Sequence, residues 1–330
     1  MMIITIVLLE VGLRLFGFGT YELPEYSMVS NPNRHLSPDA NLGIHLNPGT
    51  FAVTINKQLK YTATHLKNGQ RTCGEQVAIS DESTTLAFYG CSFTYGTGVN
   101  DWEVYPHIIQ QQFPDLKIEN HAVPGYGQAQ IILDLEKQMD SKTKPGILIL
   151  NYLSFHNERN TMNSAYQQKI RTGYAATKKI DRGIASYKCS YSFGAIENGS
   201  LKMGSISIQE INSTLPLINY SASMNAFQNL FDESVDTESD EKVTLAMIDR
   251  IHEICEEKKM KLVLSYMTHD AITQRLVAHC KSASIPTMDI FVDLNKKGST
   301  NAPYDSHPSA KTHQVYAEKL STFLRKLSDE

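Results

Sequence analysis

From residue 84 onward, short apolar runs alternate with amphipathic stretches of helical period. The apolar runs are continuous, which is typical of strands that are buried on both faces of a parallel sheet. Strands are predicted at 86–89, 117–123, 146–153, 261–267 and 286–291, and helices at 103–113, 128–139, 242–259, 271–284 and 310–327. Five strands with interleaved helices predict a three-layer α/β/α sandwich around a five-stranded, mainly parallel sheet.

Charge and cysteine content exclude several classes of protein. The 31 basic and 35 acidic residues leave a net charge of −4 and are scattered along the chain. Nucleic-acid binders usually carry a basic stripe that neutralises phosphates, so we expect no nucleic-acid partner. The five cysteines form no C-x-x-C pair, which argues against a structural zinc site or a dense disulfide framework and leaves one bridge open.

The first 18 residues are largely apolar, but Glu10 and Arg14 interrupt them. A membrane span needs about 20 mostly apolar residues, and neither a basic segment nor an A-x-A site frames this run, so a cleavable signal peptide is disfavoured. We expect residues 1–20 to form either a signal anchor or an amphipathic helix that packs on the domain or on a membrane surface.

Two other segments depart from the α/β alternation. Residues 21–83 are rich in Pro, Asn, Gly and Thr, with short apolar alternations such as 51–55, and predict an arm of extended segments and turns. The α/β domain is expected over 84–330, with an insertion at about 160–240 that is rich in Ser, Tyr and Asn. The acidic run 232–241 at its end is expected to be a solvated surface segment.

Ser92 is a candidate nucleophile. The first predicted strand runs into Gly90, and Ser92 follows at the junction of loop and helix. In an open parallel sheet, ligands gather at the carboxyl ends of the strands, so a serine hydroxyl exposed there can attack a substrate. A serine after a glycine is also common in ordinary turns and helix caps. The neighbouring Cys91 is a rival nucleophile, although a buried cysteine commonly acts as a small apolar side chain.

Asp305 and His307 stand just before the last predicted helix. In extended chain, residues i and i+2 project to the same side, so the carboxylate can fix the tautomer of the imidazole and stabilise its protonated form. A pair of metal ligands or a surface turn would have the same spacing, but no other cluster supplies the remaining ligands. We therefore predict two members of a Ser-His-Asp triad, and no metal or cofactor.

Two more loops follow strands and offer hydrogen-bond donors. Gly125 comes after the second strand and can present its backbone N–H, and Asn157 comes after the third and can present its side-chain amide. Acyl transfer needs such donors because its tetrahedral intermediate carries a negative oxygen, and loss of one donor typically costs about 10²–10³ in turnover. Each residue alone is equally compatible with a plain loop.

These four loops resemble those of the SGNH, or GDSL-like, hydrolases. The stretch G-C-S-F-T-Y-G at 90–96 is similar to block I, N-H-A-V-P-G-Y-G at 120–127 to block II, the loop of Asn157 to block III, and D-S-H-P at 305–308 to block V. The resemblance covers about 84–160 and 242–327 and implies a flavodoxin-like fold. It further implies that Ser92 is the nucleophile, His307 the base and Asp305 its orienting partner, with an oxyanion hole made by the amides of Ser92 and Gly125 and the side chain of Asn157.

The sequence departs from this family pattern in two places. Cys91 stands where the family usually has Asp, a residue outside the triad. Block III is usually G-x-N-D but is F-H-N-E here, so His156 or Asn160 is an alternative to Asn157. The α/β-hydrolase elbow G-x-S-x-G fits less well, because the second glycine is displaced to Gly96.

The sequence thus predicts a serine esterase that removes a small acyl group such as acetyl from a carbohydrate or a similar ester. One alternative is an O-acetyltransferase, or an accessory protein of envelope polysaccharide modification, with the same triad. Another is a catalytically silent module that binds a glycan or a protein. The apolar start followed by E-x-x-x-R-L also resembles membrane-anchored family members of bacterial envelopes, so we expect an extracytoplasmic protein associated with a membrane through residues 1–18. A cytoplasmic protein and any oligomeric state stay open.

Overall fold

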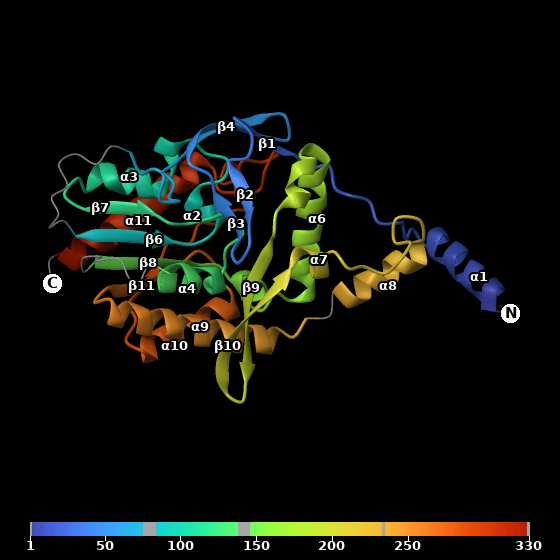
Figure 1. Cartoon of the computed structure of the whole chain (residues 1–330). Helices are drawn as coiled ribbons and strands as arrows, with labels where there is room; N and C mark the ends of the chain where they lie inside the picture. The colour runs from blue at the N-terminus through green and yellow to red at the C-terminus, as the bar shows by residue number, and fades with distance from the viewer. Residues whose placement is uncertain (1, 75–83, 138–145, 233–234, 329–330) are drawn as a thin grey trace.

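The structure is a computed structural model that describes residues 2–74, 84–137, 146–232 and 235–328 of the chain (Figure 1). At its centre lies a five-stranded sheet in which all pairings are parallel and the strand order is β12-β11-β8-β6-β7. Counted along the chain, this is the flavodoxin-like order 2-1-3-4-5. The predicted fold class and its five strands are confirmed: β6 (Thr85–Tyr89), β7 (Lys117–Asn120), β8 (Gly146–Tyr152), β11 (Lys261–Tyr266) and β12 (Thr287–Asp289).

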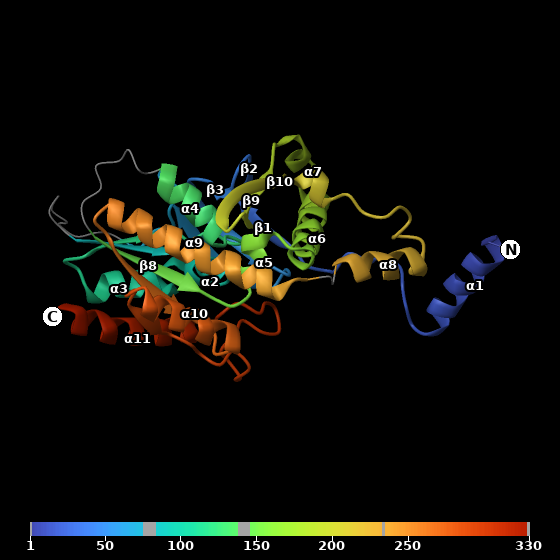
Figure 2. The same ribbon diagram turned by 90° about the horizontal axis from the view of Figure 1, so that it is seen from below.

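Helices cover both faces of this sheet, because successive strand residues point to opposite sides. Ala87 and Tyr89 of β6 pack with one group of helices, and Leu86 and Phe88 pack with the other. Figure 2 shows α4 and α9 on one side of the sheet and α3 and α11 on the other. The first layer contains α4 (Gln128–Lys137), α9 (Thr237–Glu257) and α10 (Ala271–Ser282), and the second contains α3 (Tyr105–Gln112) and α11 (Ala310–Ser328).

The strand order also places the site. The chain enters the sheet at β6 and lays β7 on one side of it and β8 on the other. Neighbouring connections diverge at such a point and leave a crevice at the carboxyl ends of the strands. The loops after β6 and β8, which carry Ser92 and Asn157, therefore begin next to each other.

Two predictions were wrong in part, one about the end of a strand and one about the acidic run. The strand expected at 117–123 ends at Asn120, because the side-chain oxygen of Asn120 accepts the backbone N–H of Ala122 at 3.2 Å and turns the chain. The acidic run is solvated only in part, since residues 236–239 are exposed but Asp240 on α9 (Thr237–Glu257) is not. Asp240 is buried and accepts hydrogen bonds from the side chains of Thr161 and Asn163.

The expected arm consists of two small antiparallel sheets. Apolar side chains of β4 and β5 are buried against Tyr95, Ala122, Val123 and Tyr126, which lie in the loops after β6 and β7. The arm therefore packs directly on the loops of the candidate site, and the extended segment predicted at 51–55 is confirmed as part of β4. Its strands are β1 (Met28–Asn31), β4 (Gly49–Ile55) and β5 (Leu59–His65) in one sheet, and β2 (Leu36–Asp39) and β3 (Gly43–Leu46) in the other.

The segment at 160–240 is ordered and partly helical. Figure 1 shows α6 standing beside the β2–β3 hairpin, with the β9–β10 hairpin next to it. Tyr166 and Ile170 of α6 form a small apolar core with Tyr191 of β9. The elements are α5 (His156–Thr161), α6 (Ser164–Ile180), η2 (Arg182–Ser186), β9 (Ser190–Glu197), β10 (Ser200–Ser207), α7 (Ile208–Ile211) and α8 (Ala222–Asp232).

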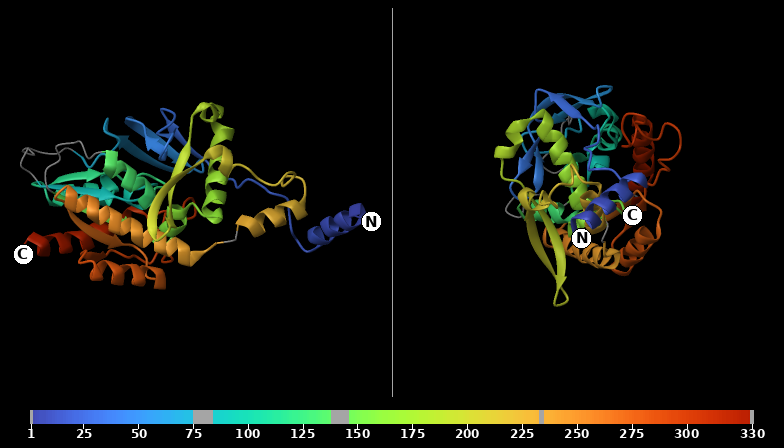
Figure 3. Two further views of the ribbon diagram at one scale, coloured as in Figure 1. Left: turned by 60° about the horizontal axis from the view of Figure 1, so that its bottom comes forward. Right: turned by 90° about the vertical axis from the view of Figure 1, so that its right-hand side faces the viewer.

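The N-terminal helix α1 (Met2–Leu15) projects from the rest of the molecule together with α8, as Figure 1 and the left view of Figure 3 show. The carboxylate of Glu10 accepts the backbone N–H groups of Ala222 and Ser223 at 2.8 and 2.9 Å, so the charge inside the apolar helix caps the start of α8. Within the residues that the structure describes, no helix has both the length and the apolar character needed to cross a bilayer.

Candidate active site

Ser92 is the first residue of the short helix α2 (Ser92–Tyr95), directly after β6. Gly90 makes the turn possible, since a Cβ there would lie 2.5 Å from the Thr94 hydroxyl oxygen and 3.1 Å from the Cβ of Asn151. The Ser92 backbone N–H donates to no acceptor among the described residues. Ser92 therefore lies at the carboxyl end of a central strand, as expected, but it is buried, whereas the sequence predicted an exposed hydroxyl.

Asp305 and His307 form a hydrogen-bonded pair. His307 Nδ1 lies 2.7 Å from Asp305 Oδ1, and the same oxygen accepts the His307 backbone N–H at 2.8 Å. A carboxylate on Nδ1 keeps the proton there and leaves Nε2 as the basic nitrogen. Burial opposes ionisation of Asp305, but the hydrogen bonds from His307 outweigh burial, and the pKa of Asp305 lies below its usual value.

The loops of Ser92 and His307 lie side by side. The ring of Phe93 contacts the ring of His307 at a centroid distance of 5.7 Å and the ring of Phe155 at 5.9 Å. A Cβ on Gly98 would come within 2.5 Å of the Asn301 amide nitrogen, and Asn301 in turn hydrogen-bonds the backbone oxygens of His307 and Pro308. The residue next to Ser92 thus touches both the imidazole and the loop after β8.

Gly125 follows β7 in a turn that requires a positive φ, here +85°. Its carbonyl oxygen accepts the Tyr166 hydroxyl at 2.8 Å, which fixes the orientation of the local backbone. Its N–H has no acceptor in the part of the chain that the structure describes. The backbone donor proposed at Gly125 is therefore free to bind a substrate oxygen.

The three candidates for the side-chain donor follow β8 and differ in their hydrogen bonds and burial. The Tyr152 hydroxyl donates to Asn157 Oδ1 at 2.8 Å, so the Asn157 amide is held by its oxygen. Asn160 is committed to the fold, since its amide group donates to the side chains of Gln128 and Thr244 and its oxygen accepts the Gln128 N–H. His156 is fully buried, and burial lowers its pKa well below the usual value. Asn157 therefore fits the predicted donor better than either alternative.

Cys91 does not compete well as the nucleophile. It has no exposed surface and belongs to the apolar core on the α3–α11 face of the sheet. All five cysteines are free and buried, so the disulfide that the sequence left open is not formed.

Sequence reasoning missed Arg71, the most deeply engaged side chain near the site. It is fully buried, and each of its five N–H groups has an acceptor. Three of the acceptors are backbone oxygens at the end of α2 and in the loop that follows it. The contacts are Asp101 Oδ1 at 2.9 Å, the oxygens of Tyr95 at 2.8 Å, Gly96 at 2.6 Å and Val99 at 2.8 Å, and that of Thr62 at 3.0 Å. Arg71 thus ties the arm to the segment that carries Ser92.

A second residue of the arm reaches the acid–base pair. The Tyr26 hydroxyl lies near the Asp305 carboxylate, and burial together with the charge of Asp305 raises the pKa of Tyr26. The adjacent Ser27 donates its N–H to Asn56, whose amide donates to the backbone oxygen of Tyr304 at 2.9 Å. No local sequence pattern predicts the contact of Tyr26 with Asp305 or that of Asn56 with Tyr304, because the two partners come from opposite ends of the chain.

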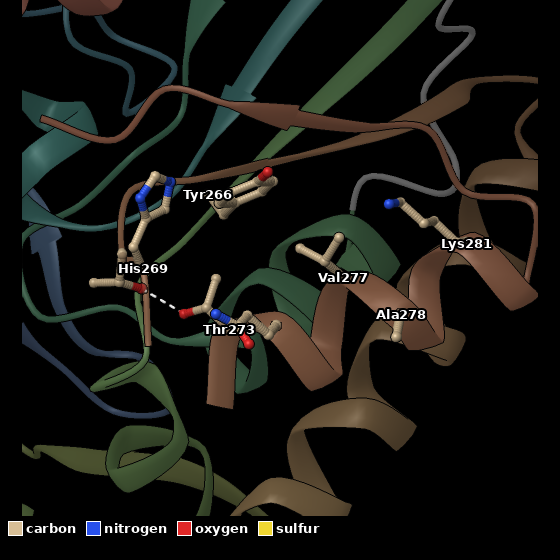
Figure 4. Close-up of a pocket in the computed structure, with 8 residues that line it drawn as sticks. Tyr266, His269, Thr273, Val277, Ala278 and Lys281 are labelled. Carbon is tan, nitrogen blue, oxygen red and sulfur yellow. Dashed lines mark hydrogen bonds between the residues drawn. The ribbon is translucent and has the colours of Figure 1, made fainter. Parts of the chain in front are cut away.

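A cavity of about 420 Å³ lies beside the carboxyl end of β11 (Figure 4). His269 at its rim pairs with Asp289 at 2.9 Å, and the Thr268 and Thr273 hydroxyls are hydrogen-bonded at 2.7 Å. The described residues that line it include neither serine nor cysteine. We therefore keep the candidate active site at Ser92.

No family model matches the chain, and no curated protein matches it. Solved structures similar to it include a member of the lipolytic G-D-S-L family from Veillonella parvula, with 11% identity over 74% of this chain and 100% of that chain and a TM-score of 0.43. A putative lipolytic protein of the same family from Desulfitobacterium hafniense shows 14% identity over 73% and 99%, with a TM-score of 0.36. A family two carbohydrate esterase from Clostridium thermocellum, in complex with cellohexaose, shows 11% identity over 92% and 86%, with a TM-score of 0.41. At these values the comparisons assign neither a family nor an activity to the chain.

Proposed function

We propose that the protein is an acyl-ester hydrolase with Ser92 as nucleophile, His307 as base and Asp305 as the residue that orients the base. The observation that supports this most is the Asp305–His307 hydrogen bond at 2.7 Å in a loop whose imidazole touches the neighbour of Ser92. Such a pair orients the imidazole that takes the proton of a hydroxyl, which is otherwise a weak nucleophile.

In the proposed reaction, Ser92 Oγ attacks the ester carbonyl carbon while His307 Nε2 takes the hydroxyl proton. The negative oxygen that forms accepts hydrogen bonds from the backbone N–H groups of Ser92 and Gly125 and from the Asn157 amide. The C–O bond to the alcohol then breaks, and His307 returns the proton to the leaving oxygen. Water, deprotonated by His307, attacks the acyl-enzyme and releases the carboxylic acid with regeneration of Ser92.

Hydrolysis of p-nitrophenyl acetate by the purified chain and by its Ser92→Ala variant tests this proposal. We expect the substitution to remove nearly all enzyme-dependent hydrolysis, since a triad without its nucleophile retains only weak catalysis. Equal rates for the two proteins would overturn the assignment of Ser92. An Asp289→Asn variant is the matched control, because it disrupts another His–Asp pair at the same edge of the sheet, that of His269.

The sequence predicts an ester of an acetyl group with a carbohydrate. In this proposal, such esters are only the first substrates to assay. Membrane attachment through residues 1–18 is likewise a proposal, supported by exposed apolar side chains such as Ile4, Leu15 and Phe16 on and next to α1. An extracytoplasmic location is a further part of the proposal, since attachment alone does not fix the side of the membrane.

A further inference from the structure

A cavity of about 290 Å³ lies between the arm and α6. One wall comes from the β2–β3 hairpin and the residues before it, and the other from α6, η2 and β9 (Figure 1). Its volume is close to the lower end of the ~300–1,000 Å³ range of small-molecule sites. Both walls lie outside the five-stranded sheet domain.

The lining of this cavity is mostly aliphatic. Met28, Leu36 and Ile44 face it from the arm, and Ile170 and Ile184 face it from the opposite wall. Two polar groups of the lining are already engaged, since Ser37 accepts the Asn47 amide and the Cys189 thiol contacts the backbone oxygen of Gly43. An apolar ligand gains from entering such a space, whereas a sugar would leave its hydroxyls without partners.

The cavity borders the candidate active site at two points. Tyr26 lines it and lies near Asp305, the partner of the base. Ile170, in the opposite wall, is one helical turn from Tyr166, whose hydroxyl binds the carbonyl oxygen of Gly125 at 2.8 Å. Residues of both walls thus connect the cavity to the site, one wall through Asp305 and the other through Gly125.

We propose that this cavity binds an aliphatic chain carried by the ester substrate. The inference rests on the proposed ester hydrolysis and specifies its substrate: an ester with a linear chain, on either its acyl or its alcohol side, that is longer than acetyl. The arm and the segment at 160–240 together supply the site, so selectivity for chain length is a property of these two additions to the sheet domain.

A substitution in α6 tests the proposal because it narrows the cavity without a clash. Gly173 lines the cavity, and a Cβ built on it meets no other atom within 4 Å. Gly173→Leu therefore adds a side chain at open space, and Ala175→Leu adds the same side chain to the same helix at a residue that does not line the cavity. Rates are measured with p-nitrophenyl acetate and octanoate, and with ethyl and octyl acetate.

The wild type should prefer the long chain in one of the two series, by about fourfold in kcat/KM for each methylene that the cavity buries. Gly173→Leu should reduce this preference at least about tenfold and leave p-nitrophenyl acetate within about twofold. Ala175→Leu should retain the preference. The series in which Gly173→Leu reduces the preference shows whether the acyl or the alcohol side of the ester enters the cavity. A wild type without preference in either series, or a preference that Gly173→Leu leaves unchanged, would overturn the proposal.

Binding separates this proposal from the catalytic one. Octanoate is titrated calorimetrically into the Ser92→Ala chain and into the same chain with Gly173→Leu added. Heat of binding in the first and its loss in the second support the cavity even where the nucleophile has been assigned wrongly. No binding to the first chain, or equal binding to both, would overturn the cavity proposal whatever the hydrolysis assays show.

Discussion

Replacement of Arg71 by lysine tests whether the arm holds the nucleophile segment in place. The guanidinium uses all five donors, whereas an ammonium has only three, so at least two of the five buried hydrogen bonds are lost. Each lost hydrogen bond to a buried charged group costs about 1–3 kcal/mol, which gives a destabilisation of about 2–6 kcal/mol. This is a large part of the ~5–15 kcal/mol by which a domain is usually stable.

Two measurements follow the effect of Arg71→Lys. Urea denaturation gives the change in the free energy of unfolding, and a serine-directed fluorophosphonate probe gives the rate at which Ser92 is labelled in the folded protein. We expect labelling to slow by about 10–10²-fold, because the oxygens of Tyr95, Gly96 and Val99 that lose contacts belong to the segment just after Ser92.

The control for this substitution is Arg275→Lys. Arg275 also binds a carboxylate, that of Glu241, through two of its nitrogens. Its side chain, however, is 56% exposed. Surface pairs contribute about 0–1 kcal/mol, so little change is expected in either measurement. Arg71→Lys with a stability within about 0.5 kcal/mol of the wild type and an unchanged labelling rate would refute the role given to Arg71.

Other predictions concern the oxyanion donor, acid stability and the N-terminal helix. Asn157→Ala should lower turnover of p-nitrophenyl acetate by about 10²–10³-fold, and wild-type turnover would exclude it as a donor. Burial lowers the pKa of His65 to about 4 and that of His35 to about 3, so the unfolded chain binds more protons as the pH falls below ~6.5. Between pH ~6.5 and its folded pKa, each histidine should lower the free energy of unfolding by about 1.4 kcal/mol for each pH unit of acidification. Chemical denaturation at several pH values measures this slope. His35→Gln should reduce the slope, and an unchanged slope would count against this account. Deletion of residues 1–18 should abolish cosedimentation with lipid vesicles, and undiminished cosedimentation would place the attachment elsewhere.

The sheet domain was predictable because its strands are buried on both faces. Continuous apolar runs such as 86–89 and 146–153 have no other good interpretation when amphipathic segments of helical length separate them. The burial of Asp240 in the acidic run 232–241 was not predictable, since charge density says nothing about partners. Asp240 lies in a buried network with Thr161 and Asn163, and only the tertiary structure brings these residues together.

The candidate site was predictable where its pattern is local. The spacing of Asp305 and His307 is enough for the hydrogen bond that the structure shows. Arg71 and Tyr26 escaped prediction because each meets its partners across the fold, and a lone arginine or tyrosine in a loop-rich arm has no period or motif. The choice among His156, Asn157 and Asn160 also required the structure, which shows that Asn160 is fully bonded within the fold.

Fluorophosphonate labelling of the full chain, with the modified peptide identified by mass spectrometry, tests the central claim most directly. We predict a single label on Ser92, formed at least about 10²-fold more slowly in a His307→Ala variant because the base that activates the hydroxyl is gone. A chain that takes up no label, a label on another residue, or equal labelling rates with and without His307 would contradict the proposed nucleophile and base.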